Sequence, residues 1–181
     1  EIPYVPEWSP LEKLNREREL IGMYLSAHPL DEYEFEMNYV CNTSTSELKN
    51  LESLQGKALR IGGMVTAVRN GTSKAGKPYG VFTLEDYSGA FEFVLFGPNY
   101  VDFGKYMIKD LYLFIHAQVI EKGSDYRNYQ QAPDPDKPKE YMLKITKIDM
   151  LSDVRNNLID KLNISFSLQE LNEDFVYEIS D

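Results

Sequence analysis

The sequence is poor in the residue types that most catalytic and metal sites need. Among 181 residues there are one cysteine, Cys41, and two histidines. A single cysteine excludes an internal disulfide framework and a zinc site built from cysteines, and it is typical of a reducing compartment, so we expect a cytoplasmic protein. No Walker A loop, dinucleotide-binding glycine pattern, HExxH or GxSxG is present. We therefore expect no catalytic residue, no metal site and no cofactor in this chain.

Long apolar runs and an excess of positive charge are also missing. The longest purely apolar run is only a few residues, which excludes a transmembrane helix. The N-terminus lacks the basic and apolar regions of a signal peptide. It starts with Glu1 rather than methionine, so we expect a fragment of a longer protein. The net charge of −10 excludes a strongly basic nucleic-acid binder at the level of the whole chain.

The negative charge is distributed unevenly along the chain. Residues 1–56 carry a net charge of −7, residues 57–121 carry +1, and residues 122–181 carry −4. Within the middle segment, residues 69–77 hold three positive charges and no acid. This segment is therefore the only part of the chain whose charge does not oppose a polyanion.

The N-terminal third reads as helical. Ser9, Pro10 and Glu12 form a capping box with proline in the first turn. Apolar residues then recur at helical spacing, which predicts a helix that ends near Ser26, before His28 and Pro29. Shorter helices are predicted over residues 30–39 and 48–54.

From residue 58 the apolar residues alternate, which predicts β-strands. The expected strands cover residues 58–67, 79–87, 90–96, 111–121 and 141–151. The first contains a glycine pair, Gly62 and Gly63, at which we expect a β-bulge. A short helix over residues 97–105 separates the third strand from the fourth. A helix at that position is typical of an OB-fold, a five-stranded Greek-key barrel, and has no place in an SH3-like barrel.

The predicted fold class is therefore mainly β. We expect a helical N-terminal extension over residues 1–56 that packs on the barrel, an OB-fold domain over residues 57–151, and a short α/β tail over residues 152–181. The tail is too short to bury a core alone, so it reads as the truncated start of a further, partner-binding domain. A monomer is expected.

Few side chains with catalytic potential remain, and each has a structural explanation. His28 is expected to orient a helix–loop junction, and His116 to be a histidine of the barrel or of a solvated strand face. Asp86 precedes a predicted tight turn, where a carboxylate bonds to the hairpin backbone. Glu85 and Asp86 point to opposite faces of a strand and cannot form an acid–base pair.

Nucleic-acid binding has a stronger case. OB-folds lay a single strand along a positive groove and stack its bases on exposed aromatic side chains. The loop at residues 69–79 would supply Arg69, Lys74 and Lys77 to phosphates and Tyr79 to a base, with Arg60 supporting the groove. The alternative is a polar hairpin tip whose lysines only keep it soluble, and the sequence weighs both equally.

Alternation assigns the two faces of the second and third strands. The more apolar set is expected inside: Phe82, Leu84, Phe91, Phe93 and Leu95. The outer set is then Tyr79, Val81, Thr83, Glu92 and Val94, together with Arg60 and Met64 of the first strand. This surface is poor in aromatics and contains an acid, so it predicts weak binding. An inverted register would instead expose Phe82, Phe91 and Phe93 as a stacking platform. The loop at residues 122–140 either folds over a bound strand or is a surface loop.

Several blocks of sequence resemble the bacterial DNA polymerase III alpha subunit family. Residues 19–30 (ELIGMYLSAHPL) are similar to the segment just upstream of that family's OB domain. GMVTAV at 63–68, TSKAGK at 72–77, FTLEDYSG at 82–89 and EFVLF at 92–96 are similar to the OB domain itself, in the same order. The OB core alone also resembles anticodon-binding domains of class II synthetases, but the helical segment at 8–30 favours the polymerase.

The resemblance implies an OB-fold module of a replicative polymerase that contacts single-stranded template. The catalytic aspartates and the internal clamp-binding motif would lie outside this chain, so the fragment itself is expected not to be an enzyme. Other polymerase domains and replisome subunits are the expected partners, with no membrane. The alternative implied by the acidic N-terminus is a structural spacer between the polymerase core and the clamp-loader-binding domain, without DNA affinity.

Overall fold

The computed structural model describes residues 8–22, 24–121 and 139–158, with side chains up to residue 154 in the last helix. Five antiparallel strands form one sheet in the order β3-β2-β1-β4-β5. They are β1 (Ala58–Thr72), β2 (Pro78–Asp86), β3 (Gly89–Phe96), β4 (Tyr112–Glu121) and β5 (Tyr141–Met150). The mainly β, OB-like class is confirmed, but the sheet is not closed, because β3 and β5 are its two outer strands.

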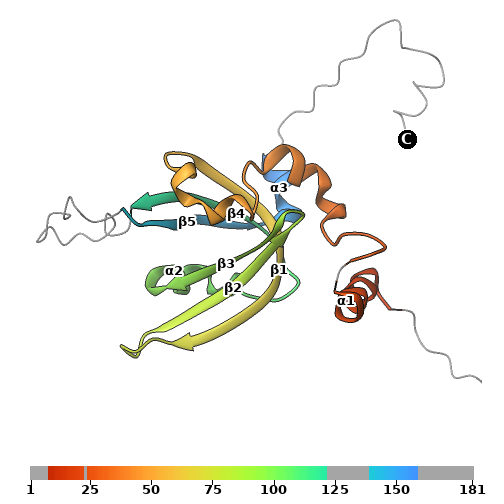
Figure 1. Cartoon of the computed structure of the whole chain (residues 1–181), viewed down its shortest axis with the longest axis horizontal. Coiled ribbons are helices and arrows are strands. Elements are labelled where there is room, and N and C mark those ends of the chain that lie inside the picture. Colours follow the sequence, from red (N-terminus) through yellow and green to blue (C-terminus); the bar gives the residue numbers. More distant parts are fainter. Residues whose placement is uncertain (1–7, 23, 122–138, 159–181) are drawn as a thin grey trace, which may run out of the picture.

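The long strand β1 connects two halves of the sheet that face each other (Figure 1). Its first half pairs with β4 from Ala58 to Met64, and its second half pairs with β2 from Met64 to Thr72. The register shift lies between Val65 and Ala67, where the partner changes. The bulge predicted at the glycine pair is therefore wrong in position.

Crowding, rather than a bulge, explains the glycine pair. A Cβ on Gly62 would lie 2.5 Å from the sulfur of Met37, and a Cβ on Gly63 would lie 2.7 Å from the carbonyl oxygen of Glu85. Both residues stay in regular pairing with β4. The glycines let an N-terminal segment and the neighbouring strand approach β1 closely.

The main core fills the space between the two halves of the sheet. Phe82 and Phe93 stack with ring centroids 5.1 Å apart, and Leu84 and Leu95 are fully buried beside them. This confirms the inward face predicted for β2 and β3, with Phe91 packed at its margin. The inverted register, with Phe82 and Phe93 on the surface, is excluded.

A short helical segment plugs one end of the barrel, as predicted. It consists of α2 (Gly97–Phe103) followed by the 3-10 turn η5 (Gly104–Tyr106). Tyr100 and Phe103 pack against the main core, and the Tyr100 hydroxyl donates to the Asn70 side chain at 3.3 Å.

The helices before the barrel are shorter than predicted. Helix α1 (Pro10–Ile21) starts with the expected capping box but ends at Gly22, which adopts a left-handed conformation with φ 88°. The segment that follows forms only short turns: η1 (Asp31–Tyr33), the π-helical η2 (Glu36–Val40), η3 (Glu47–Lys49) and η4 (Leu51–Leu54). Leu48 and Leu54 of η3 and η4 are buried in the main core.

A second apolar cluster lies outside the barrel, against the outer side of β1 and β4. It contains Leu30, Met64, Phe114, Leu151 and Val154, the last two from α3 (Leu151–Leu158). Met64 was predicted on the open outer face and is only 2% exposed, because α3 and the segment around Leu30 cover it. Val81, also predicted outside, is 4% exposed.

Asp86 links the N-terminal segment to the β2–β3 turn. Its carboxylate accepts hydrogen bonds from the backbone N–H groups of Ser88 and Gly89, which confirms its predicted role in the turn. It also accepts from the backbone and the hydroxyl of Thr45, at 2.7 and 2.6 Å. One buried carboxylate therefore fixes both the hairpin turn and the chain that crosses it.

His28 has the predicted positioning role. Its Nδ1 accepts from the Leu30 backbone N–H at 3.2 Å, and its ring packs against Tyr87 at the β2–β3 turn, with centroids 4.6 Å apart. Burial lowers the pKa of His28 below its ordinary value. No helix in the described part of the chain is long and apolar enough to cross a membrane.

Candidate nucleic-acid interface

The outer face of β1, β2 and β3 is the surface on which four of the five predicted contact residues fall or border. Strand register arranges it in rows that run across the three strands. One row contains Gly71, Tyr79 and Phe96. The next contains Arg69, Val81 and Val94, and the third contains Ala67, Thr83 and Glu92. We call these three rows the front face.

An aromatic pair occupies one end of the front face. The rings of Tyr79 and Phe96 lie 5.4 Å apart at an interplanar angle of 33°. The Tyr79 ring lies over Gly71, where a Cβ would come within 2.7 Å of it. Phe96 is 57% exposed, so it offers the more accessible ring to a stacking base.

The sequence analysis did not identify Phe96 as a contact residue. Phe96 lies on the same face of β3 as Glu92 and Val94, which were predicted outside, so extending the alternation by two residues would have identified it. Its neighbour Val94 is 45% exposed. The front face therefore presents more apolar surface than the sequence predicted.

Arg69 crosses the middle of the front face. Its guanidinium forms an ion pair with the Glu92 carboxylate at 3.2 Å, and both side chains are largely exposed. The pair spans from β1 to β3, and Val81 of the intervening strand is buried. A phosphate approaching Arg69 would compete with Glu92.

The lysines lie at the tip of the β1–β2 hairpin, beyond the aromatic pair. The predicted loop at residues 69–79 is mostly strand, and the turn itself is limited to residues 73–77. Ser73 and Lys77 close it through a backbone hydrogen bond of 2.8 Å, and Gly76 adopts φ 73°. Lys74 and Lys77 are exposed there. The tip is thus a tight turn that carries two cations beside the front face.

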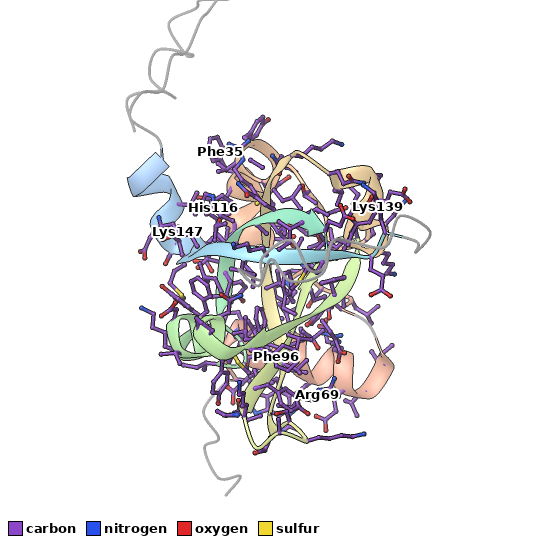
Figure 2. The ribbon with its side chains drawn as sticks, turned by 90° about the vertical axis from the view of Figure 1, so that its left-hand side faces the viewer. Phe35, Arg69, Phe96, His116, Lys139 and Lys147 are labelled. Carbon is purple, nitrogen blue, oxygen red and sulfur yellow. The ribbon has the colours of Figure 1, made fainter. Side chains whose placement is uncertain are left out.

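Arg60 does not belong to this surface. It lies in the half of β1 that pairs with β4, opposite His116, nine residues before Arg69. At about 3.3 Å per residue this is roughly 30 Å along the strand. In Figure 2, Arg69 and Phe96 lie in the lower half of the molecule, whereas His116 lies in the upper left. The prediction that Arg60 shares a groove with Tyr79 is therefore wrong.

Other site chemistry is sparse. Within the described ranges, no three histidine, cysteine, aspartate or glutamate side chains gather as metal ligands would. Burial raises the pKa of the Cys41 thiol to about 12, so this cysteine is a poor nucleophile at neutral pH. Most of the loop predicted at residues 122–140 lies outside the described residues, as does the tail after residue 158.

Comparison with known proteins identifies relatives from several bacteria. The DNA polymerase III subunit alpha of Vibrio cholerae is 34% identical over 115 residues, which cover 64% of this chain. The corresponding subunit of Saccharopolyspora erythraea is 32% identical over 117 residues. That of Haemophilus influenzae is 26% identical over 171 residues, or 94% of the chain. The chain is similar to a part of the DNA polymerase III alpha subunit.

The relationship is to a small part of a much larger subunit. The chain spans 10% of the Vibrio cholerae alpha subunit and 14% of the Haemophilus influenzae one. No protein-family model matches the chain. The resemblance read from the sequence blocks is confirmed, and the match to the Haemophilus alpha subunit covers nearly the whole chain rather than the OB core alone.

Proposed function

We propose that this chain is the OB-fold module of a replicative polymerase alpha subunit and guides single-stranded template DNA weakly across its front face. The observation that carries the proposal is the alignment of the Tyr79–Phe96 pair with Arg69 and the hairpin lysines on one side of the sheet. Aromatic rings beside cations are the features with which OB-folds hold single strands. In this proposal, chemistry takes place elsewhere in the parent subunit.

The positions of the front-face residues suggest a separate role for each. Phe96 stacks a base, and Tyr79 supports Phe96 from the side. Lys74 and Lys77 attract the phosphate backbone at the hairpin tip, and Arg69 contacts phosphate when Glu92 releases it. Stacking contributes roughly 1–3 kcal/mol per base, whereas each exposed ion pair contributes roughly 0.2–1 kcal/mol. Such a surface holds a strand loosely, which suits a template that must move.

The second candidate function is a structural spacer between the polymerase core and a partner-binding domain. It is favoured by the engagement of Arg69 with Glu92 and by the acidic N-terminal segment. In this reading the front face has no affinity for single strands. The two candidate functions therefore differ in the affinity of the chain for single-stranded DNA, which can be measured directly.

The deciding experiment is fluorescence anisotropy of a labelled oligo-dT titrated with the chain at about 20 and 150 mM salt. We expect salt-sensitive binding that weakens in the Lys74→Ala/Lys77→Ala double variant. Each lost phosphate contact should reduce the slope of log K against log salt by roughly 0.7. Phe96→Ala should weaken binding about 5- to 150-fold, as expected for the loss of one stacked base.

Lys105→Ala is the matched control for the lysine variants, because Lys105 lies in η5 and outside the front face. It should bind as the unaltered chain does. Absence of binding at 20 mM salt would reject the guiding role and favour the spacer.

A further inference from the structure

A second row of basic side chains lies on the other half of the sheet. Arg60 of β1 is directly opposite His116 of β4, which is directly opposite Lys147 of β5. Because neighbouring strands are about 4.8 Å apart, the three residues span roughly 10 Å. Arg60 and Lys147 are the two permanent cations of this row, with His116 between them. We call it the rear row.

One side of the rear row borders the second apolar cluster. The ring of Phe114, a member of that cluster, meets the His116 ring edge-on with centroids 4.8 Å apart. The side chain of His116 is still 30% exposed, and that of Lys147 is 64% exposed. An apolar wall beside exposed cations strengthens their attraction for an anion, because it lowers the local dielectric constant.

Among the described residues, Asp149 is the acid that pairs with members of the row. Asp149 pairs with the Lys147 ammonium at 2.8 Å and approaches His116 Nε2 at 3.7 Å. Among the described residues, Arg60 has no ion-pair partner, and its backbone rather than its guanidinium is fixed by Asn42. One carboxylate against two permanent cations leaves the row with a net positive charge, which rises further when His116 is protonated.

The protonation of His116 should depend on whether an anion is bound beside it. Burial lowers its pKa below the ordinary value, and the charges of Lys147 and Arg60 lower it further, while Asp149 acts in the opposite direction. A bound anion would add a second favourable partner for the imidazolium and raise the pKa. Proton uptake and anion binding at this position therefore support each other.

From this geometry we infer that Arg60, His116 and Lys147 form a second phosphate-binding site for the DNA backbone, separate from the front face and strengthened by protonation of His116. The two sites lie on different halves of the sheet, with His116 and Lys147 well apart from Arg69 and Phe96 in Figure 2. The inference does not depend on the front face binding DNA. It gives a binding role to Arg60, which the structure separates from the other predicted contact residues.

The test uses the chain with the front face weakened by Arg69→Ala/Lys74→Ala/Lys77→Ala, so that remaining affinity reports on other surfaces. Labelled oligo-dT and a DNA duplex are titrated at pH 6.0 and pH 8.0 in 20 mM salt. We expect binding several-fold tighter at pH 6.0, because the protonated imidazole donates to phosphate. The difference between pH values should disappear in His116→Gln, and Lys147→Glu should weaken binding at both pH values.

Lys105→Glu is the matched control, because it changes the net charge equally at an exposed lysine outside the rear row. The inference is overturned if Lys147→Glu weakens binding no more than Lys105→Glu, or if the pH dependence persists in His116→Gln. Circular dichroism of each variant at both pH values establishes that it is folded. Comparison of single-stranded and duplex probes shows which form of DNA the row contacts. If Lys74→Ala/Lys77→Ala removes DNA binding and the rear-row variants do not, the result supports DNA binding by the front face and rejects the phosphate site at the rear row.

Discussion

If the front face binds DNA as proposed, Glu92 is the residue that limits its affinity. Its carboxylate pairs with Arg69 at 3.2 Å, so a phosphate approaching Arg69 would compete with it. An exposed ion pair is worth roughly 0.2–1 kcal/mol, so removing the competitor should tighten DNA binding by about 1.4- to fivefold. We therefore expect Glu92→Gln to bind oligo-dT more tightly in the anisotropy titration. Glu52→Gln, an equal change of net charge at an exposed glutamate of η4, should have little effect. Equal gains in the two variants would mean that only net charge matters.

Asp86 is the residue whose loss should affect stability most. It is 5% exposed and accepts hydrogen bonds from Thr45, Ser88 and Gly89. In Asp86→Asn the remaining carbonyl oxygen can still accept from the turn, but an NH2 group replaces the oxygen that accepts from the Thr45 backbone N–H. Leaving this buried donor without an acceptor should lower the free energy of unfolding by roughly 1–3 kcal/mol. Urea denaturation measures this loss, and Asp102→Asn, on the exposed side of α2, should change it by less than about 0.5 kcal/mol.

At the residue scale, the alternation of apolar and polar residues predicted the side chains that line the main core. It placed Phe82, Leu84 and Phe93 inside correctly. It left Met64 exposed on the outer face, because nothing in the local pattern shows that α3 and the Leu30 segment cover β1 from the other side. Residues covered by distant parts of the chain cannot be identified from local periodicity.

At the scale of elements, the glycines of β1 give a direct test of close packing. An alanine at Gly63 would place its Cβ 2.7 Å from a carbonyl oxygen of β2, which cannot move without disturbing the strand pairing. We expect Gly63→Ala to reduce the free energy of unfolding by roughly 1–3 kcal/mol. In Gly104→Ala the nearest atom to the new Cβ is 3.9 Å away and the backbone is already helical. That variant should be neutral or more stable by up to about 1 kcal/mol. Chemical denaturation of the two variants side by side would contradict the packing argument if they lose equal stability.

Element types were more predictable than element ends. The capping box at Ser9 correctly predicted the start of α1. The helix ends at Gly22, which adopts a left-handed conformation. The sequence analysis missed this end because apolar residues continue at helical spacing after Gly22. The hairpin at the β1–β2 turn is longer than predicted, because Asn70 and Thr72 pair with β2 despite their polar character. The length of the hairpin depends on the strand that pairs with this segment, so the composition of the segment alone does not predict it.

At the scale of the whole molecule, the segment before residue 57, which was predicted to pack on the barrel, contributes leucines to both apolar clusters. Leu48 and Leu54 lie in the main core, and Leu30 lies in the second cluster, each at most 4% exposed. Burying a leucine contributes about 1.5–3 kcal/mol, so the three together match a large part of a typical domain stability of roughly 5–15 kcal/mol. We expect a chain that starts at residue 57 not to fold into a stable barrel.

A chain that starts at residue 27 is the matched comparison. It retains all three leucines and the Thr45–Asp86 contacts, and it loses α1 with the Arg18–Glu85 ion pair. It should keep a dispersed amide NMR spectrum and a cooperative urea transition, whereas the shorter chain should show neither. A folded barrel from residue 57 alone would contradict this expectation and would show that the N-terminal leucines are not needed for the fold.

The open sheet has a consequence for how the molecule behaves at high concentration. In the described sheet, β3 is an edge, and the backbone groups on its outer side are not paired with another strand. Exposed edges invite pairing between copies of a protein, and a charged side chain on the edge strand opposes it. Glu92 lies in the middle of β3, between the apolar neighbours Phe91 and Phe93. The same carboxylate that restrains Arg69 therefore also protects the solubility of the chain, so an engineered gain in DNA affinity at this position would come with a greater tendency to self-associate.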